Sequence, residues 1–239
     1  MGECWGEGTA TFMILGNTCT RSCGFCNVKT GRPDEVDWKE PIKVAKSIQI
    51  MGIKHAVVTS VDRDDLKDNG SILWRETIIA IRRLNPNTTL ETLIPDFKGD
   101  ETSLDRIIDV EPEVISHNLE TVRRLTKEVR IQAKYDRSLT VLKYLKDKGV
   151  KRTKSGIMLG LGEQKEEVIE SLEDLREVGV DVLTIGQYLQ PSKKHLPVKS
   201  FIEPRVFDDY KKIGEGLGFR HVESGPLVRS SYKAQKHIT

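Results

Sequence analysis

Short runs of apolar, β-branched residues alternate along the chain with longer stretches in which apolar residues recur at helical spacing. The short runs predict strands over residues 10–15, 55–60, 88–94, 114–118, 154–159, 182–188 and, as a closing strand, 220–224. The longer stretches predict helices over 41–51, 71–84, 103–110, 119–127, 137–148, 166–178 and 204–217. Gly218 follows the last of them and is typical of a helix end. Because strand and helix alternate about six times, the pattern indicates parallel strands joined by crossover helices.

The first strand is not followed by Gly-x-Gly-x-x-Gly, which argues against a dinucleotide-binding, doubly wound sheet. We therefore predict an α/β fold of the partial (β/α)6-type TIM barrel kind, with residues 1–239 forming a single domain. Polar residues gather directly after the strands, at positions that ring the C-terminal face of a barrel, where active sites are built. They are Asp62, Asp64, Asp65, Asp96, Asn118, Glu120, Gln187 and Gln190.

Composition narrows the class of partner. The 239 residues carry 38 basic and 36 acidic side chains, a net charge of +2, which provides no general field for nucleic acid or a membrane surface. Pairs such as Lys193-Lys194 are interpreted as solvated faces. No apolar run approaches the roughly 20 residues that span a bilayer, and the N-terminal residues lack a signal-peptide pattern. We predict a cytoplasmic protein that binds neither nucleic acid nor membrane.

Three of the four cysteines form the spacing C-x3-C-x2-C directly after the first strand, as Cys19, Cys23 and Cys26. Three thiolates on one short loop can bind three irons of a [4Fe-4S] cluster and leave the fourth iron open to a small molecule. Gly24 lets the backbone turn tightly around such a cluster. Zinc with one further ligand is the alternative, although structural zinc usually uses paired C-x2-C units.

This loop, placed after the first strand of a β/α array, resembles the radical SAM superfamily. The resemblance implies the radical SAM fold and an open iron that takes the amino and carboxylate groups of S-adenosylmethionine. One electron from the cluster, supplied by a donor such as ferredoxin or flavodoxin, then cleaves the sulfonium and yields a 5′-deoxyadenosyl radical. The protein's share is to position the cofactor and exclude water.

A narrower resemblance extends from residue 3 to about residue 234. It is carried by GTATFMILGNTCTRSCGFCNV, TSVDRDDLKDNG, ETLIPDFKGD, SHNLETV, KSGIMLGLGE, LTIGQYLQPSKKHLPV and ESGPLVRSSYKA, which are similar to lipoyl synthases. The resemblance implies a radical SAM sulfurtransferase that inserts two sulfur atoms at C6 and C8 of an octanoyl chain. That chain is attached to a lysine of a lipoyl carrier domain, in a 2-oxoacid dehydrogenase E2 or a glycine cleavage H protein. A second, auxiliary [4Fe-4S] cluster provides the sulfur.

In that family three cysteines spaced C-x4-C-x5-C and a serine of an Arg-Ser-Ser-Tyr stretch hold the auxiliary cluster. The third cysteine corresponds to Cys4, within a remnant of that segment over 1–9, and the serine to Ser231, favoured over Ser230, in a tail over 225–239. The other two cysteines would precede Met1. We expect either a truncated sequence or a natural short form that cleaves S-adenosylmethionine without donating sulfur. The chain as written is expected to bind the first cluster and to fail at net lipoyl synthesis.

Other residues are candidates for cofactor contacts. Asn118 and Glu120 are expected to hydrogen-bond the ribose or the methionine end of S-adenosylmethionine, the alternative being a helix N-cap and a first-turn carboxylate. Phe25 is expected to pack near the adenine. Arg137 faces either the cofactor carboxylate or solvent.

Two loops complete the set. The loop 190–198 contacts the octanoyl-lysine or its carrier, or else is a rigid connection. The aspartates at 62, 64 and 65 are interpreted as a polar active-site loop rather than a metal site.

Two other functions remain open. One is a different radical SAM sulfur-insertion enzyme of the biotin-synthase kind, which the RSSY and SHNLETV segments do not support. The other is an inactive or regulatory iron–sulfur binding module, and formation of 5′-deoxyadenosine would separate it from an enzyme. No Ser-His-Asp pattern emerges that would support hydrolytic catalysis.

Overall fold

The structure, a computed structural model, describes residues 6–238. They divide into two compact units. The first unit comprises 6–21, 28–115 and 233–238, and the second comprises 22–27 and 116–232. Strand β6 (Val114–Ser116) lies where the chain passes from one unit to the other.

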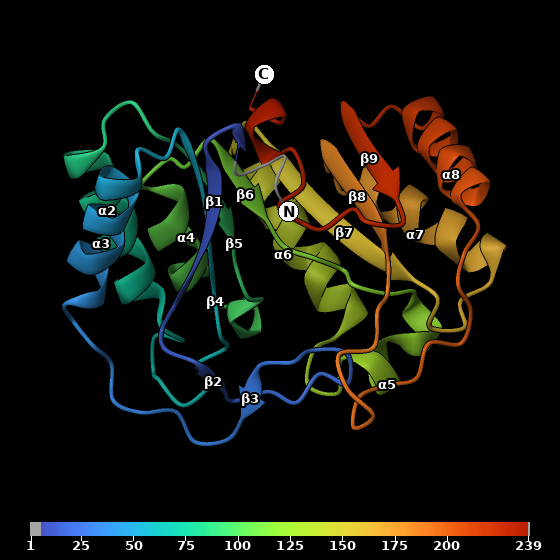
Figure 1. The fold of residues 1–239 in the computed structure, drawn as a ribbon, viewed down its shortest axis with the longest axis horizontal. Coiled ribbons are helices and arrows are strands. Elements are labelled where there is room, and N and C mark those ends of the chain that lie inside the picture. The colour runs from blue at the N-terminus through green and yellow to red at the C-terminus, as the bar shows by residue number, and fades with distance from the viewer. Residues whose placement is uncertain (1–5, 239) are drawn as a thin grey trace. The chain divides into compact units, whose positions relative to one another are not determined.

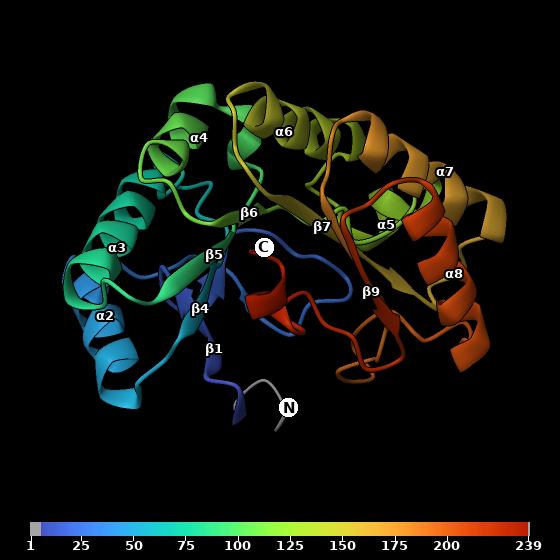
Figure 2. The same cartoon turned by 90° about the horizontal axis from the view of Figure 1, so that it is seen from above.

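The first unit is built on three parallel strands, β1 (Thr9–Ile14), β4 (His55–Ser60) and β5 (Thr89–Leu93). Their register places Thr9 opposite His55 and His55 opposite Thr89. Helices α2 (Glu40–Met51), α3 (Ser71–Leu84) and α4 (Glu101–Ile108) lie along one side of these strands (Figure 2).

The core of the first unit lies between these strands and helices. Ala56 and Val58 of β4 and Ile48, Trp74 and Ile78 of the helices are fully buried. Burial of apolar surface contributes about 25 cal/mol per Å2, so this face fixes the helices to the sheet. A second, two-stranded sheet in the same unit pairs β2 (Thr18–Cys19) with β3 (Lys29–Thr30), and the 3-10 helix η1 (Phe97–Gly99) follows β5.

The second unit repeats the plan with β7 (Thr153–Leu159), β8 (Val182–Gln187) and β9 (His221–Gly225), again parallel. Every residue of β8 is buried, as expected of a strand that is covered on both faces. Its helices are α5 (Thr126–Val129), α6 (Tyr135–Asp147), α7 (Lys165–Glu177) and α8 (Pro204–Gly216), of which α6, α7 and α8 lie along one side of the strands of this unit (Figures 1 and 2).

Two short 3-10 helices complete the described elements. One, η2 (Arg123–Leu125), precedes α5, and the other, η3 (Ala234–Lys236), belongs to the first unit. The segment around η3 is tied to β1 by a hydrogen bond from Thr9 Oγ1 to Gln235 Oε1 at 3.1 Å. Among the residues described, no helix combines the length and the apolar character that crossing a membrane requires.

The predicted alternation of parallel strands and helices is confirmed, with most boundaries displaced by two residues or fewer. Gly218 stands in the left-handed region at φ +89° after α8, and the N–H of Phe219 reaches back to the Gly214 carbonyl at 3.2 Å. This is a Schellman-type helix end, as the glycine indicated.

The helix expected over 119–127 is wrong. Glu120 forms an isolated bridge to Ile157, with its N–H on the Gly156 carbonyl and its carbonyl on the N–H of Met158, each at 2.8 Å. Its φ of +69° is incompatible with a right-handed helix. Pairing with β7 therefore displaces the helix start to Thr126, after the short 3-10 helix η2.

Candidate functional site

The first cysteine of the loop, Cys19, ends β2 and is held to Asp62, two residues after the end of β4. Its Sγ accepts hydrogen bonds from the backbone N–H groups of Asp62 at 3.3 Å and of Arg21 at 3.4 Å. Oδ2 of Asp62 lies 3.8 Å from the same sulfur. Thr20 adds two bonds to the Asp62 carbonyl, from its N–H at 3.1 Å and its Oγ1 at 3.0 Å. N–H groups directed at a sulfur stabilise negative charge on it, which suits an iron ligand.

Arg21 lies between the first two cysteines and is buried, with 4% of its side chain exposed. Its Nε and Nη2 donate to the two carboxylate oxygens of Asp64 at 2.7 and 2.9 Å. Nη2 also donates to Oδ1 of Asp96 at 2.6 Å, and Nη1 lies 3.2 Å from Oδ1 of Asp62. Three carboxylates thus surround one guanidinium.

Arg21 and the carboxylates around it stabilise each other's charged forms. Burial lowers the pKa of the Arg21 guanidinium, but the hydrogen bonds to Asp64 and Asp96 outweigh it, so the pKa stays above its ordinary value. Burial raises the pKa of the Asp64 carboxyl, and the bonds to Arg21 more than reverse that, so this pKa is lowered. Arg21 and Asp64 therefore both remain charged at neutral pH.

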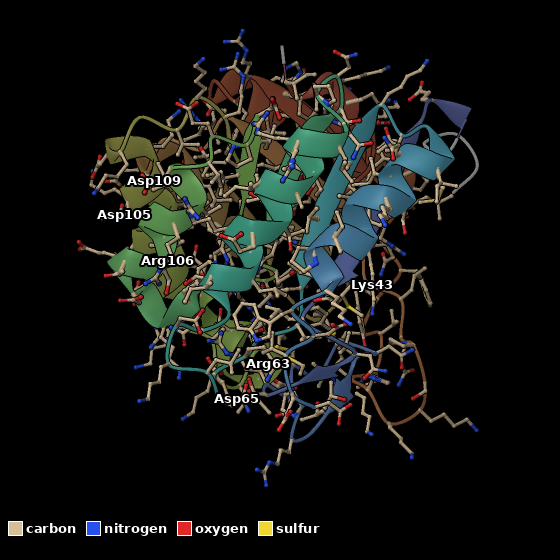
Figure 3. The ribbon with its side chains drawn as sticks, turned by 90° about the vertical axis from the view of Figure 1, so that its left-hand side faces the viewer. Lys43, Arg63, Asp65, Asp105, Arg106 and Asp109 are labelled. Carbon is tan, nitrogen blue, oxygen red and sulfur yellow. The ribbon has the colours of Figure 1, made fainter. Side chains whose placement is uncertain are left out.

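Asp65, which also follows β4, is paired with a second arginine. Arg63 is buried and donates from Nε and Nη2 to Asp65, each at 2.9 Å (Figure 3). The carboxylates at 62, 64 and 65 thus form the predicted polar loop and bind guanidinium groups.

No single-ion site is found among the side chains of residues 6–238, since no three His, Cys, Asp or Glu are grouped as one metal ion requires. A [4Fe-4S] cluster places each thiolate on a different iron, so its three cysteines need not converge on one point.

The other two cysteines lie in the second unit, on a tight turn. The N–H of Cys26 bonds to the Cys23 carbonyl at 3.1 Å, and the N–H of Gly24 bonds to the Val129 carbonyl at 2.9 Å. A Cβ on Gly24 would stand 2.9 Å from the Leu196 side chain. The close approach of Leu196 therefore leaves no place for a side chain at position 24.

The loop 190–198 is hydrogen-bonded to this turn. The N–H of Leu196 bonds to the Gly24 carbonyl at 3.0 Å, and Nε2 of His195 lies 3.1 Å from the Cys26 carbonyl. Tyr188 donates its hydroxyl to the Leu196 carbonyl at 2.8 Å, and Gln190 donates from Nε2 to the His195 carbonyl at 2.9 Å. These bonds hold the loop against the cysteine turn, and its rigidity and its contact with a substrate or carrier stay predictions.

Asn118 and Glu120 come together after β6. Nδ2 of Asn118 donates to Oε1 of Glu120 at 3.0 Å. Burial raises the pKa of the Glu120 carboxyl, while the Arg130 charge and the Asn118 bond oppose the rise. Part of Glu120 remains accessible to solvent, which moderates the shift. No helix begins at 118–120, so the alternative role of Asn118 as a helix N-cap is wrong.

One atom of this pair is buried without a partner. Oδ1 of Asn118 has no hydrogen bond, although a buried polar group normally has one. Beside it, a Cβ added to Gly156 would stand 2.5 Å from Oγ1 of Thr184 and 3.3 Å from that same Oδ1. The Thr184 side chain thus occupies the place beside Gly156, and the unpartnered Asn118 Oδ1 is left to accept a hydrogen bond from a ligand hydroxyl or amine.

The other predicted site residues are less grouped. Phe25 is half-buried against the apolar core of the second unit, as is Leu196. Arg137 is half-buried on α6. Ser231 is half-buried in the turn where the N–H of Tyr232 bonds to the Arg229 carbonyl at 2.8 Å. Cys4 lies outside the described residues.

Three contributors were missed from the sequence: Arg21, Arg130 and His195. The side chain of Arg130 is buried and donates from Nη1 to the Leu119 carbonyl at 3.0 Å and to Oγ of Ser138 at 3.1 Å. For Arg21 a signal existed, because an arginine inside the cysteine motif faces several aspartates that follow the strands. For the other two, only the folded chain brings the partners together.

The class of protein follows from comparison of this fold and site with known proteins. Residues 13–186 match the model of the Radical SAM superfamily. The crystal structure of Streptococcus suis SuiB bound to precursor peptide SuiA is similar, with a TM-score of 0.73 and 13% identity over 95% of this chain and 51% of that one. The chain thus spans about half of the SuiB chain. It has the radical SAM fold and belongs to that superfamily.

Curated relatives identify the family within this class. A lipoyl synthase of Christiangramia forsetii is 79% identical over 238 residues, which cover 100% of this chain and 81% of that protein. A lipoyl synthase of Flavobacterium johnsoniae is 77% identical over the same number of residues, covering 100% of this chain and 83% of that protein. The chain belongs to the lipoyl synthase family.

The described residues fit the cofactors of this family, a [4Fe-4S] cluster and S-adenosylmethionine. The sulfur of Cys19 receives two backbone N–H groups, as cluster ligands do. The unpartnered Asn118 oxygen suits a polar organic ligand that donates a hydrogen bond.

Proposed function

We propose that this protein is a lipoyl synthase, an S-adenosylmethionine-dependent sulfurtransferase that inserts two sulfur atoms at C6 and C8 of a protein-bound octanoyl chain. The carrying observation is the identity of 79% across the whole chain to a protein of that name. Unactivated C–H bonds require a radical, and the cysteine loop suits the chemistry that generates one.

Cys19, Cys23 and Cys26 would hold the radical-generating [4Fe-4S] cluster. When bound, this group supplies the electron that splits S-adenosylmethionine into methionine and a radical able to abstract hydrogen. The chain's own contribution is to fix the ligands. The N–H groups of Asp62 and Arg21 support the Cys19 sulfur, and the His195 ring and the Leu196 N–H support the turn carrying the other two.

S-adenosylmethionine would contact Asn118 and Glu120. The Asn118 Oδ1 is buried and available to accept a hydrogen bond, and the Glu120 carboxylate accepts from hydroxyl or amino groups. Phe25 is proposed to pack near the adenine, and Arg137 to face the carboxylate of the cofactor.

Cys4 and Ser231 are proposed as ligands of the auxiliary, sulfur-donating cluster, with Ser230 as the alternative serine. The turn that carries Ser231 is anchored to β8, because Nη1 of Arg229 donates to the Gln187 carbonyl at 3.1 Å. An anchored turn would let a serine oxygen serve as a fixed ligand.

The partners follow from the proposed reaction. The substrate is an octanoylated lysine on a lipoyl carrier domain of a 2-oxoacid dehydrogenase E2 or a glycine cleavage H protein, and ferredoxin or flavodoxin supplies electrons. We place the reaction in the cytoplasm, where reducing conditions keep thiols free, and propose that the two units act as one radical SAM domain.

The test is anaerobic reconstitution with iron and sulfide, followed by S-adenosylmethionine, a reductant and an octanoyl-lysine peptide. We expect 5′-deoxyadenosine from the chain as written, and sulfur-containing peptide, detected by mass spectrometry, only where a complete auxiliary cluster is present. Replacing any one of Cys19, Cys23 and Cys26 by alanine should abolish 5′-deoxyadenosine formation. A reconstituted protein that holds a cluster and forms no 5′-deoxyadenosine would instead be an inactive iron–sulfur module.

A further inference from the structure

Arg21 is the most heavily paired side chain of the cysteine loop, and the proposed reaction assigns it no role. Its guanidinium is buried at 4% exposure, and its partner Asp96 is fully buried. The partners come from two strand ends, since Asp62 and Asp64 follow β4 and Asp96 follows β5. Burying a cation among several anions costs free energy unless the charged groups lie at hydrogen-bond distance from one another. Arg21 and its three aspartates therefore hold one another in a single arrangement.

Asp62 connects this group of paired side chains to the Cys19 sulfur. Oδ1 of this aspartate lies 3.2 Å from Nη1 of Arg21, while Oδ2 lies 3.8 Å from Cys19 Sγ. The backbone N–H of Asp62 donates to that same sulfur at 3.3 Å. Arg21 is therefore paired with Asp62, whose backbone N–H and carboxylate both lie beside the Cys19 sulfur.

The backbone of Arg21 is fixed as well. Its carbonyl accepts a hydrogen bond from Oγ1 of Thr30 at 3.2 Å, and its N–H donates to Cys19 Sγ at 3.4 Å. The bidentate pairing with Asp64 requires the planar fork of an arginine, which a lysine does not have.

We propose that Arg21 is a positioning residue that sets the reduction potential of the cluster held by this loop, by neutralising the Asp62 carboxylate beside Cys19. This inference rests on the proposed function, since it requires a cluster on these cysteines. Negative charge near an iron–sulfur cluster disfavours the added electron. Without the guanidinium, the Asp62 charge acts on the cluster in full and the potential becomes more negative.

The experiment is an EPR-monitored redox titration of the anaerobically reconstituted protein without S-adenosylmethionine. Arg21→Met should shift the midpoint potential to more negative values. Adding Asp62→Asn to that variant should return the potential toward the wild-type value. Arg21→Lys, which keeps the charge and loses the fork, should fall between wild type and Arg21→Met.

Arg63→Met is the matched control. Arg63 is equally buried and pairs with Asp65, and its Nη2 donates to the Asp34 carbonyl at 3.1 Å. Both of these partners lie outside the cysteine loop, so the potential should stay unchanged. An equal shift in Arg63→Met and Arg21→Met would overturn the proposal.

If Arg21→Met does not fold, the single variant Asp62→Asn tests the proposal. This variant keeps Arg21 paired with Asp64 and Asp96, and it should shift the potential to more positive values. An unchanged potential overturns the proposal. A wild-type protein that takes up no [4Fe-4S] cluster would overturn the proposed function itself, a distinguishable result.

Discussion

At the scale of single residues, Glu120 combines a left-handed backbone, at φ +69°, with a carboxyl whose pKa is raised by burial. Both features cost free energy, as is common where a side chain serves a ligand. We predict that Glu120→Gln weakens binding of S-adenosylmethionine roughly tenfold, because a charged acceptor contributes about 1.5–3 kcal/mol to its hydrogen bonds. Isothermal titration of the reconstituted protein measures this.

The same substitution changes the pH dependence of stability. As pH rises above the ordinary value of 4.5, the unfolded chain loses the Glu120 proton first, so the free energy of unfolding declines up to the raised pKa and stays lower beyond it. Glutamine does not ionise. Glu120→Gln should therefore unfold at a higher temperature than wild type at pH 7 and show little advantage at pH 4. Glu128→Gln, at an exposed position nearby, should show no such difference.

At the scale of elements, the loop 190–198 is held to the cysteine turn by the ring of His195 and by the backbone N–H of Leu196. Because a carbonyl only accepts, Nε2 of the ring donates to Cys26, and Nδ1 accepts from the Ser192 hydroxyl at 2.8 Å. Loss of one such bond costs about 1 kcal/mol, so His195→Ala should raise the open population of the loop about fivefold. Limited proteolysis within 190–198 measures it.

Lys194→Ala provides the comparison for that loop, since Lys194 is exposed and its side chain could be removed without loss of the ring's bonds. Equal proteolysis rates in the two variants would show that the ring does not hold the loop.

The turn at 228–232 depends on a different element, β8. A Cβ on Gly186 would overlap the Val228 carbonyl oxygen, which leaves no room for a side chain. Gly186→Ala should cost about 1–3 kcal/mol through overpacking and lower the melting temperature by roughly 2–4 °C per kcal/mol. Tryptic cleavage after Arg229 should accelerate.

Gly225→Ala is the matched control, because its Cβ would meet Val228 Cγ2 at an ordinary 3.5 Å. It should melt within a degree or so of the wild type. If both alanine variants behave alike, close packing at Gly186 is not what places the turn.

At the scale of the whole molecule, cluster binding should stabilise the folded chain. A ligand at 100 times its Kd adds about 2.7 kcal/mol, which corresponds to a rise in melting temperature of roughly 5–10 °C. Anaerobic thermal scans of reconstituted protein, before and after removal of iron by a chelator, measure it. Cys23→Ala should lose the rise, whereas a rise that survives in this variant would place the iron elsewhere.

Much of the fold was predictable, because local patterns and global structure agree. The strand 55–60 and the helix 71–84 were predicted to the residue, since each is bounded by clear changes in hydrophobic period. The structure of segment 119–127 was not predicted correctly. Its apolar residues recur at helical spacing, but Glu120 pairs with β7 instead of entering a helix. Propensity is a weak guide wherever a tertiary hydrogen bond competes with it.

By itself the sequence determined the chemistry: three thiolates at a fixed spacing, a β/α alternation and the motifs of one family. These are properties of neighbouring residues, which the chain carries before it folds. Only the tertiary structure decided which distant groups support the thiolates. The pairing of Arg21 with Asp96, separated by 75 positions, and of His195 with Cys26, separated by 169, depends on how strands are juxtaposed. Such contacts leave no periodic trace in the sequence, because charge and hydrogen bonding act through space rather than along the chain.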